Sequence, residues 1–156
     1  MAAGTGTVNF DGELTQNTCD VSIGGQGSDA TIVLPTVNVS LLQTAAQTAG
    51  LQTFILRTSN CNPDMWTYAA FFEAGPTVDT LTGRLKNTNK TGATNVSLQL
   101  VDPLAQKPIQ AGNQNQVANN TYYRPNNLAY AVQYYAEGPT TPGLVNSSVV
   151  YSLMYK

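Results

Sequence analysis

Residues 143–156 read GLVNSSVVYSLMYK. From Val145 to Tyr155 every second position, except Ser147, carries an apolar or aromatic side chain. A period of two is typical of a β-strand with one buried face. The segment carries no charge before Lys156 and no proline after Pro142, although sandwiches usually protect their outer edges with charges, prolines or bulges. The sequence therefore predicts a long final strand with an unprotected edge. Its inward face is expected to carry Gly143, Val145, Ser147, Val149, Tyr151, Leu153 and Tyr155.

A second segment with the same period lies near the other end of the chain. Residues 4–15 read GTGTVNFDGELT, and their polar face includes Asp11 and Glu13. Two regular strands at the chain ends can pair with each other inside one domain, or the first can belong in a neighbouring molecule. The pattern alone leaves both arrangements open. The opposite face of this segment consists of Gly4, Gly6, Val8, Phe10, Gly12 and Leu14.

Between these ends the pattern is that of short strands separated by turns. A short helix is expected only over residues 40–49 (SLLQTAAQTA), with Gly50 as its stop. Pro35 limits the apolar run 31–34 to an edge or a strand end. About seven strands at turn spacings of about ten residues indicate one antiparallel β-sandwich. The clearest strands are expected at residues 53–56, 66–73, 96–101, 128–136 and 145–156.

Composition narrows the classes of function. The chain has 156 residues, which suits one domain. Only 10% of them are charged, against about 25% in an average soluble domain. Thr, Asn, Gln and Ser make up 54 of the 156 residues, so the surface is wetted by uncharged polar groups. Seven Lys and Arg at a net charge of −2 exclude a basic nucleic-acid surface.

Catalytic and metal-binding residue types are scarce. Histidine is absent, which excludes Ser-His-Asp and Cys-His catalysis and the commonest transition-metal ligand. Nine Asp and Glu are scattered along the chain, so no acid–base pair can be assigned. Cys19 and Cys61 lie 42 positions apart, and neither belongs to a CxxC pair. Two reduced thiols or one disulfide in an exported chain fit these cysteines. We predict no catalytic residue, no metal and no cofactor.

Five segments, taken in order, carry a more specific pattern: GTVNFDGELTQNTC (6–19), VLPTV (33–37), SNC (59–61), LTGRLKNTNKTGATNVSLQLVD (81–102) and YAVQYYAEGPTTPGLVNSSVVYSLMYK (130–156). Its most specific features are the spacing from Gly12 to Cys19, the second cysteine at Cys61, and the pair of Gly143 with the penultimate Tyr155. Each feature is weak alone, but their order and spacing together make a strong signal. This pattern resembles that of a chaperone–usher pilin, and above all the major subunits of type 1 and type 3 fimbriae of Gram-negative bacteria.

The resemblance implies an all-β fold, namely an incomplete immunoglobulin-like antiparallel β-sandwich that lacks its seventh strand. One disulfide would join Cys19 to Cys61, and a hydrophobic groove would lie open beside the last strand. In this family a periplasmic chaperone lends a strand to the groove. At the outer-membrane usher the N-terminal extension of the next subunit replaces that strand, a recognised case of β-strand addition called donor-strand exchange. Residues 1–15 would be this extension, and residues 16–156 the pilin domain.

Carried over residue by residue, the resemblance assigns a donor strand and an acceptor groove. Gly12 matches the position at which a side chain would collide with the groove floor. The residues assigned to the donor face are Val8, Phe10, Gly12 and Leu14. The residues assigned to the acceptor groove are Gly143, Val145, Val149, Tyr151, Leu153 and Tyr155.

The predicted function is that of a structural subunit of an adhesive fimbria on the surface of a Gram-negative bacterium. Its expected partners are identical subunits in a head-to-tail helical polymer, the periplasmic chaperone, the outer-membrane usher, and tip adhesin or adaptor subunits. The alternatives are a minor tip or adaptor pilin and a carbohydrate-binding sandwich, for which the tyrosines of residues 122–135 would form the sugar platform. We also expect the extension to be docked in a groove in the structure, because a free terminal segment is usually poorly ordered.

Overall fold

The computed structural model of the chain describes residues 4–12, 19–60, 67–116 and 127–155. Within these ranges regular structure is almost entirely β-strand, and no helix there is long and apolar enough to cross a membrane. A single 3-10 turn, η1 (Val39–Leu41), lies between the first two strands. The strands are β1 (Asp20–Ile23), β2 (Thr48–Ser59), β3 (Thr67–Phe72), β4 (Leu85–Lys86), β5 (Val96–Asp102), β6 (Lys107–Ile109), β7 (Asn127–Ala136) and β8 (Tyr151–Tyr155).

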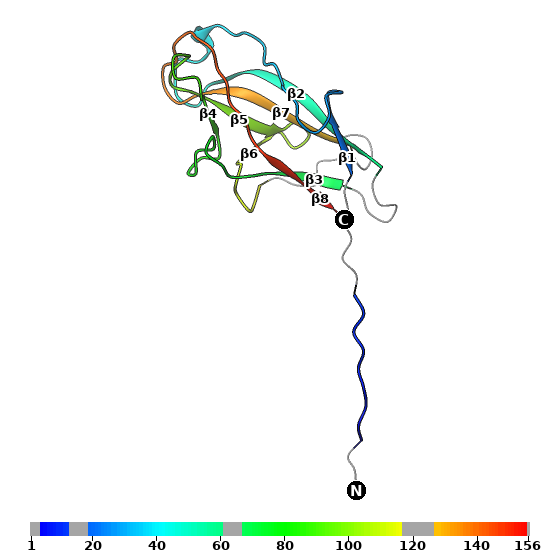
Figure 1. Cartoon of the computed structure of the whole chain (residues 1–156). Helices are drawn as coiled ribbons and strands as arrows, with labels where there is room; N and C mark the ends of the chain where they lie inside the picture. Colours follow the sequence, from blue (N-terminus) through cyan, green and yellow to red (C-terminus); the bar gives the residue numbers. More distant parts are fainter. Residues whose placement is uncertain (1–3, 13–18, 61–66, 117–126, 156) are drawn as a thin grey trace.

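The strands form two antiparallel sheets that enclose a common core (Figure 1). The larger sheet has six strands in the order β1-β2-β7-β5-β4, with β6 added beside β5. The smaller sheet pairs β3 with β8. β7 is buried along most of its length because it pairs with β2 on one side and with β5 on the other. The predicted antiparallel β-sandwich is confirmed.

The core lies between the two sheets. Tyr130 of β7 and Phe72 of β3 are almost completely buried, and their rings meet edge to face with centroids 5.0 Å apart. Leu56 of β2 and Leu100 of β5 complete this layer from the larger sheet. Burying a large apolar side chain stabilises a fold by about 1.5–3 kcal/mol. The period-two apolar positions of these strands therefore supply most of the cohesion between the sheets.

The helix predicted over residues 40–49 is wrong. Only η1 (Val39–Leu41) is helical there, and β2 already begins at Thr48. The side chain of Gln47 accepts hydrogen bonds from the backbone N–H groups of Gln43 and Thr44, at 2.8 and 2.9 Å. These bonds hold a turn in place of a helix. Gly50 is not a helix stop, since it lies in β2 at a φ of +70°, where an added Cβ would come within 2.8 Å of the Tyr134 ring.

The predicted strands of residues 66–73, 96–101 and 128–136 correspond to β3, β5 and β7. Residues 53–56 lie within the longer β2. The final strand is shorter than predicted, because β8 begins at Tyr151. Residues 145–150 keep the two-residue alternation of burial, but their neighbours are turns of residues 77–93 and not a second strand. Residues 31–34 are outside any strand.

Candidate binding groove

A groove of about 720 Å³ opens into the core between two stretches of chain. One bank is formed by residues 28–32 with Leu34, and the other by residues 147–153. The floor is apolar and comes from both sheets, so this side of the core lacks the cover that a complete sandwich would give it. The floor side chains include Ile23, Phe54, Leu56, Phe72, Leu85, Leu98, Leu100 and Val132.

The bank at residues 147–153 belongs to a chain segment whose backbone is bonded on one edge. The carbonyl groups of residues 144, 146, 148 and 150 accept hydrogen bonds from Ala93 N–H (3.0 Å), Thr88 N–H (2.8 Å), Thr77 Oγ1–H (2.6 Å) and Glu73 N–H (2.8 Å). Peptide groups of an extended chain alternate in direction. The N–H and C=O groups of residues 145, 147, 149, 151 and 153 therefore point to the opposite edge, where the groove lies.

The facing bank is a segment outside the strands whose backbone is only partly bonded. The Gln26 side chain bonds both backbone groups of Thr31 at 3.1 Å, whereas those of residues 32–34 have no hydrogen-bond partner among the described residues. In the part of the chain that the structure describes, residues 30–37 make no backbone–backbone hydrogen bond. Ile32 and Leu34 turn inward and pack against the core, whereas Val33 between them is 78% exposed. The groove is thus an apolar floor between two segments whose backbone groups have room for a strand.

Tyrosine hydroxyls tie the banks to the body. Tyr151 Oη–H donates to the carbonyl of Ser28 at 2.7 Å, so one bond joins the two banks. Tyr134 Oη–H donates to the carbonyl of Pro35 at 2.9 Å and anchors the first bank to β7. Burial raises the pKa of both tyrosines, and for Tyr151 the nearby Asp29 carboxylate adds to the effect. Both hydroxyls are therefore neutral donors at physiological pH.

Ser147 is a polar residue on the inward face of the 147–153 bank. Its Oγ is buried and has no hydrogen-bond partner among the described residues. A buried hydroxyl without a partner costs about 1–3 kcal/mol. An occupant of the groove that offers a donor or an acceptor at this point would remove that cost.

The structure brings together only part of the predicted groove set. Val149, Tyr151 and Leu153 line the groove, and Val145 packs against the core beyond it. Gly143 lies away from the groove, where an added Cβ would approach Ala93 N to 2.6 Å. Tyr155 pairs with Thr67 at the end of β8.

Sequence reasoning missed the second bank and Ser147. The signal for the bank was the apolar run of residues 31–34 ahead of Pro35, which indicates an edge or a strand end but does not show what it faces. Ser147 shares the inward face of Val149 and Tyr151, so its position on that face was readable from the sequence. The sequence could not show that its hydroxyl lacks a hydrogen bond, because that depends on the residues packed against it.

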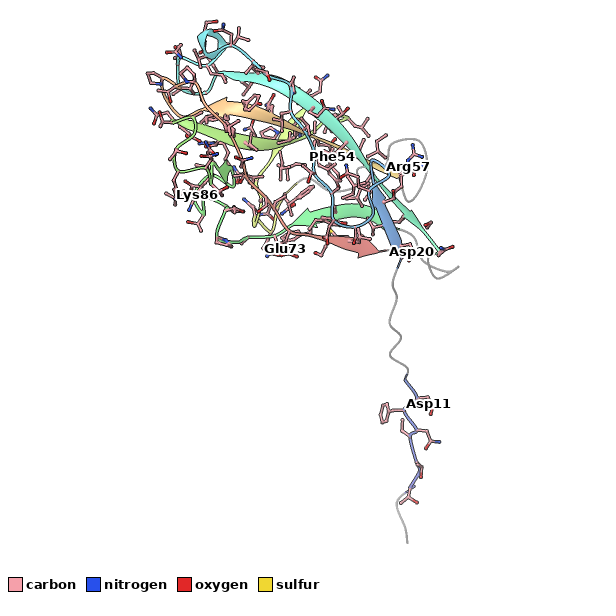
Figure 2. The ribbon with its side chains drawn as sticks, turned by 45° about the horizontal axis from the view of Figure 1, so that its top comes forward. Asp11, Asp20, Phe54, Arg57, Glu73 and Lys86 are labelled. Carbon is pink, nitrogen blue, oxygen red and sulfur yellow. The ribbon has the colours of Figure 1, made fainter. Side chains whose placement is uncertain are left out.

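The prediction that the extension is docked in a groove is wrong for this structure. Residues 4–12 belong to no strand and lie apart from the sandwich (Figure 1). Asp11 marks this separation in Figure 2. Val8 is 75% and Phe10 is 90% exposed. The physical reason is that the segment reaches no open edge of its own chain. Pairing of the two terminal segments within one molecule is therefore not what the chain does.

Several sequence expectations fall on residues outside the described ranges. Among them are Leu14 of the donor face, Cys61, and Tyr122 and Tyr123 of the sugar-platform alternative. Cys19 is not a free cysteine, but its pairing with Cys61 stays a prediction. Among the described residues no group of three or more His, Cys, Asp or Glu could hold a metal ion.

The strongest charged contact lies on the large sheet, away from the groove. Glu137 Oε1 accepts from Arg84 Nε at 2.6 Å and from Ser97 Oγ at 2.8 Å, and Glu137 Oε2 accepts from Arg84 Nη2 at 3.0 Å. The Arg84 guanidinium also stacks on the Tyr135 ring at 3.9 Å. The bond from Arg84 lowers the pKa of Glu137. This cluster joins the residue before β4 to the residue after β7.

Comparisons with known proteins agree with this geometry. No protein-family model matches the chain. The chain is 38% identical over 161 residues to the major fimbrial subunit SMF-1 of Stenotrophomonas maltophilia (strain K279a), an alignment that covers 98% of this chain and 94% of the relative. It is 33% identical over 159 residues to the F17 fimbrial protein of Escherichia coli, covering 97% and 87% of the two chains.

A chain from the solved structure of a chaperone–usher pilus is similar in fold. The TM-score is 0.64 at 20% sequence identity, and the match covers 100% of this chain and 98% of the other. At that identity the likeness concerns the fold alone. The fold is thus shared with a chain of a chaperone–usher pilus.

Proposed function

Because the chain belongs to the family of chaperone–usher fimbrial subunits, we propose that it is a structural subunit of a surface fimbria of a Gram-negative bacterium. It polymerises by placing its N-terminal extension, residues 1–15, in the groove of a neighbouring copy. The observation that carries the proposal is the groove itself, an apolar floor flanked by two segments that each carry backbone groups without hydrogen-bond partners. No feature of the described residues supports an enzyme.

The groove accepts an added β-strand on both sides. Residues 145–153 offer every second N–H and C=O on one side, and residues 32–34 offer backbone groups without partners on the other. A strand placed between them can form a hydrogen-bond ladder with each. Each bond of such a ladder stabilises by about 0.5–1.5 kcal/mol net. This is β-strand addition, in which the backbone supplies affinity and alternate side chains supply specificity.

The extension has the complementary pattern. Residues 8–14 are as long as residues 147–153, and they present Val8, Phe10, Gly12 and Leu14 on one face. Val8 and Phe10 are exposed in the free chain, so docking gains their burial. Each apolar side chain buried on the floor adds about 1.5–3 kcal/mol. Asp11 and Glu13, on the other face, stay in solvent.

A polymer follows from the geometry of this contact. Residues 4–12 of the extension lie apart from their own sandwich (Figure 2). A contact between a tail and the groove of the next copy is head-to-tail and does not close on itself, so it generates a filament. Before assembly the groove needs a temporary occupant, which is the role we assign to a strand of the periplasmic chaperone. The outer-membrane usher is the place where the extension of the next subunit replaces it.

The test uses the full-length monomer at low concentration and a synthetic peptide of residues 4–15. We expect a large, slow and nearly irreversible rise in thermal midpoint when the peptide is added. A control peptide in which Val8, Phe10 and Leu14 are replaced by Thr keeps the length and charge and should cause no rise. An unchanged midpoint with the native peptide, in a chain that is already stable, would overturn the proposal and favour a self-sufficient binding module.

A further inference from the structure

The small sheet has two outer edges. One belongs to the segment that ends in β8 and faces the groove, and the other belongs to β3 and points away from β8. Glu73 N–H donates to the carbonyl of Val150, and Phe72 faces Tyr151 in the next pair of the register. Pairs alternate between bonded and non-bonded in an antiparallel ladder. The N–H and C=O of Phe72 therefore point outward, away from β8, and need a partner on that edge.

The side-chain amide of Gln116 takes both of these backbone groups. Its Oε1 accepts from Phe72 N–H at 2.8 Å, and its Nε2 donates to the Phe72 carbonyl at 3.0 Å. A carboxamide offers an acceptor and a donor in one plane, as a peptide group does. Gln116 thus occupies the position that a peptide unit of an added strand would take. A second bond from Nε2 to the Asn113 carbonyl, at 3.1 Å, holds the amide in this orientation.

The loop of residues 110–116 is shaped to bring Gln116 to this edge. Gly112 N–H donates to the Phe72 carbonyl at 2.8 Å, so that carbonyl has two donors. Gly112 has a φ of +79°, and an added Cβ would lie 2.9 Å from the Ala74 Cβ. Only glycine allows both this backbone conformation and this approach. The next outward N–H of β3, that of Ala70, donates to Tyr130 Oη at 2.8 Å.

We propose that Gln116 is a specificity-determining residue of assembly, which closes the β3 edge and so limits each subunit to one incoming strand. A strand edge with free N–H and C=O groups is a template for pairing with another chain. The small sheet has two outer edges, and a subunit that accepted another copy at each of them would form branched polymers. Closure at Phe72 leaves the groove as the place of addition. This inference rests on the proposed function of the groove and goes beyond it.

The experiment counts peptides of residues 4–15 bound to the full-length monomer by native mass spectrometry. The excess of peptide is raised in steps. Gln116→Met keeps the length of the side chain and removes both hydrogen bonds. Gln114→Met places the same residue on an exposed position of the same loop and is the matched control. Hydrogen exchange of the Phe72 amide, followed by NMR, reports on the edge itself.

We expect the wild-type chain and Gln114→Met to hold one peptide at every excess. Gln116→Met should hold one peptide tightly and a second that exchanges rapidly. Without peptide, its Phe72 amide should exchange about tenfold faster than in the wild type, the effect of one lost hydrogen bond. Peptide at high excess should restore the protection. Gln116→Met with one peptide at every excess, and no gain of protection at Phe72, would overturn the inference. A wild-type chain that binds no peptide would instead overturn the proposed function.

A second variant separates loss of the hydrogen bond from misfolding. In Gln116→Glu the carboxylate still accepts from Phe72 N–H, and Gly112 N–H still donates to the Phe72 carbonyl. Gln116→Glu should therefore hold one peptide at every excess and keep the protection of the Phe72 amide, as the wild type does. A second peptide on Gln116→Glu, or rapid exchange of its Phe72 amide, would contradict the role of the hydrogen bond to Phe72 N–H.

Discussion

The two outer edges of the small sheet are both formed by extended chain, but they differ in whether their outward backbone groups have hydrogen-bond partners. The edge of β3 finds its hydrogen-bond partners within its own chain, at Gln116 and Tyr130. The edge of the 145–153 segment faces the groove, and across the groove lie residues 32–34, whose backbone groups have no hydrogen-bond partner among the described residues. The difference shows that a strand does not by itself determine whether its edge is free to pair with another chain. That depends on whether side chains elsewhere in the fold satisfy the outward peptide groups.

The same contrast applies to the core. Phe72 contributes its backbone to the closed edge, while its side chain reaches the groove floor. Phe72 thus contributes its peptide group to the closed β3 edge and its ring to the floor of the open groove. Substitutions at the closed β3 edge should therefore affect the stability of the monomer, whereas substitutions in the strand that occupies the groove should affect assembly.

The largest effect is expected from Gly12→Val, which should stop fibre growth. An added Cβ at Gly12 meets nothing in the free chain, so the stability of the monomer should not change. In the docked strand the branched side chain would meet the groove floor. Fibre length by electron microscopy and monomer stability in urea are the measurements. Asn9→Val puts the same residue on the outward face and should assemble normally, whereas normal growth by Gly12→Val would refute the assigned register.

Phe10→Ala should weaken each joint by about 3–5 kcal/mol, the usual cost of truncating a buried Phe. Phe10 is 90% exposed in the free chain, so the loss should appear only in the polymer. The measurement is the concentration of guanidinium that dissociates preformed fibres. Asp11→Ala, one position away on the solvent face, is the control. Equal resistance of Phe10→Ala and wild-type fibres would count against burial of this ring.

Much of this contrast could be predicted from the sequence, because it depends on local period. The inward face of residues 145–153 follows from alternation alone, and Val145, Ser147 and Val149 are indeed half-buried while Leu144 and Asn146 are exposed. The type and place of β3, β5 and β7 follow in the same way. These features need only neighbouring residues, so pattern reasoning suits them.

The rest depends on contacts between distant parts of the chain. The turn at residues 43–47 replaced a helix because Gln47 bonds the turn and Ala136 pairs with it across the fold. Residues 145–150 pair with turns and not with a strand, which no alternation predicts. Gln116 closes an edge 44 residues earlier in the chain. Such partners are set by topology, and a single sequence does not show them.

Tyr130→Phe should test the closed edge through folding and not through assembly. The hydroxyl accepts the N–H of Ala70 in a fully buried place, and burial raises the pKa of Tyr130 to about 12. Leaving that N–H without a partner should cost about 1–3 kcal/mol in unfolding free energy, measured by urea denaturation of the monomer. Tyr134→Phe loses a more exposed bond to Pro35 and should cost less. An equal cost for both variants would show that burial of the Ala70 N–H is not what makes the bond valuable.

The smallest effect is expected at the far edge of the large sheet, where Arg84 and Glu137 clamp β4 to the end of β7. Because the bond from Arg84 holds the pKa of Glu137 below its ordinary value of 4.5, the clamp's contribution is fully present above that value and is lost as pH falls through the folded-state pKa. The side chains of Arg84 and Glu137 are 18% and 37% exposed, so solvent screening limits the contribution to about 1 kcal/mol or less. Urea denaturation at pH 7 and pH 3 should show this loss in the wild type and a smaller one in Glu137→Gln, which cannot titrate there. Binding of the residue 4–15 peptide at pH 7 should be the same in both proteins, because the clamp touches neither bank of the groove. A Glu137→Gln chain with weakened peptide binding would mean that the two sides of the sandwich are coupled, and the separation of folding from assembly would fail.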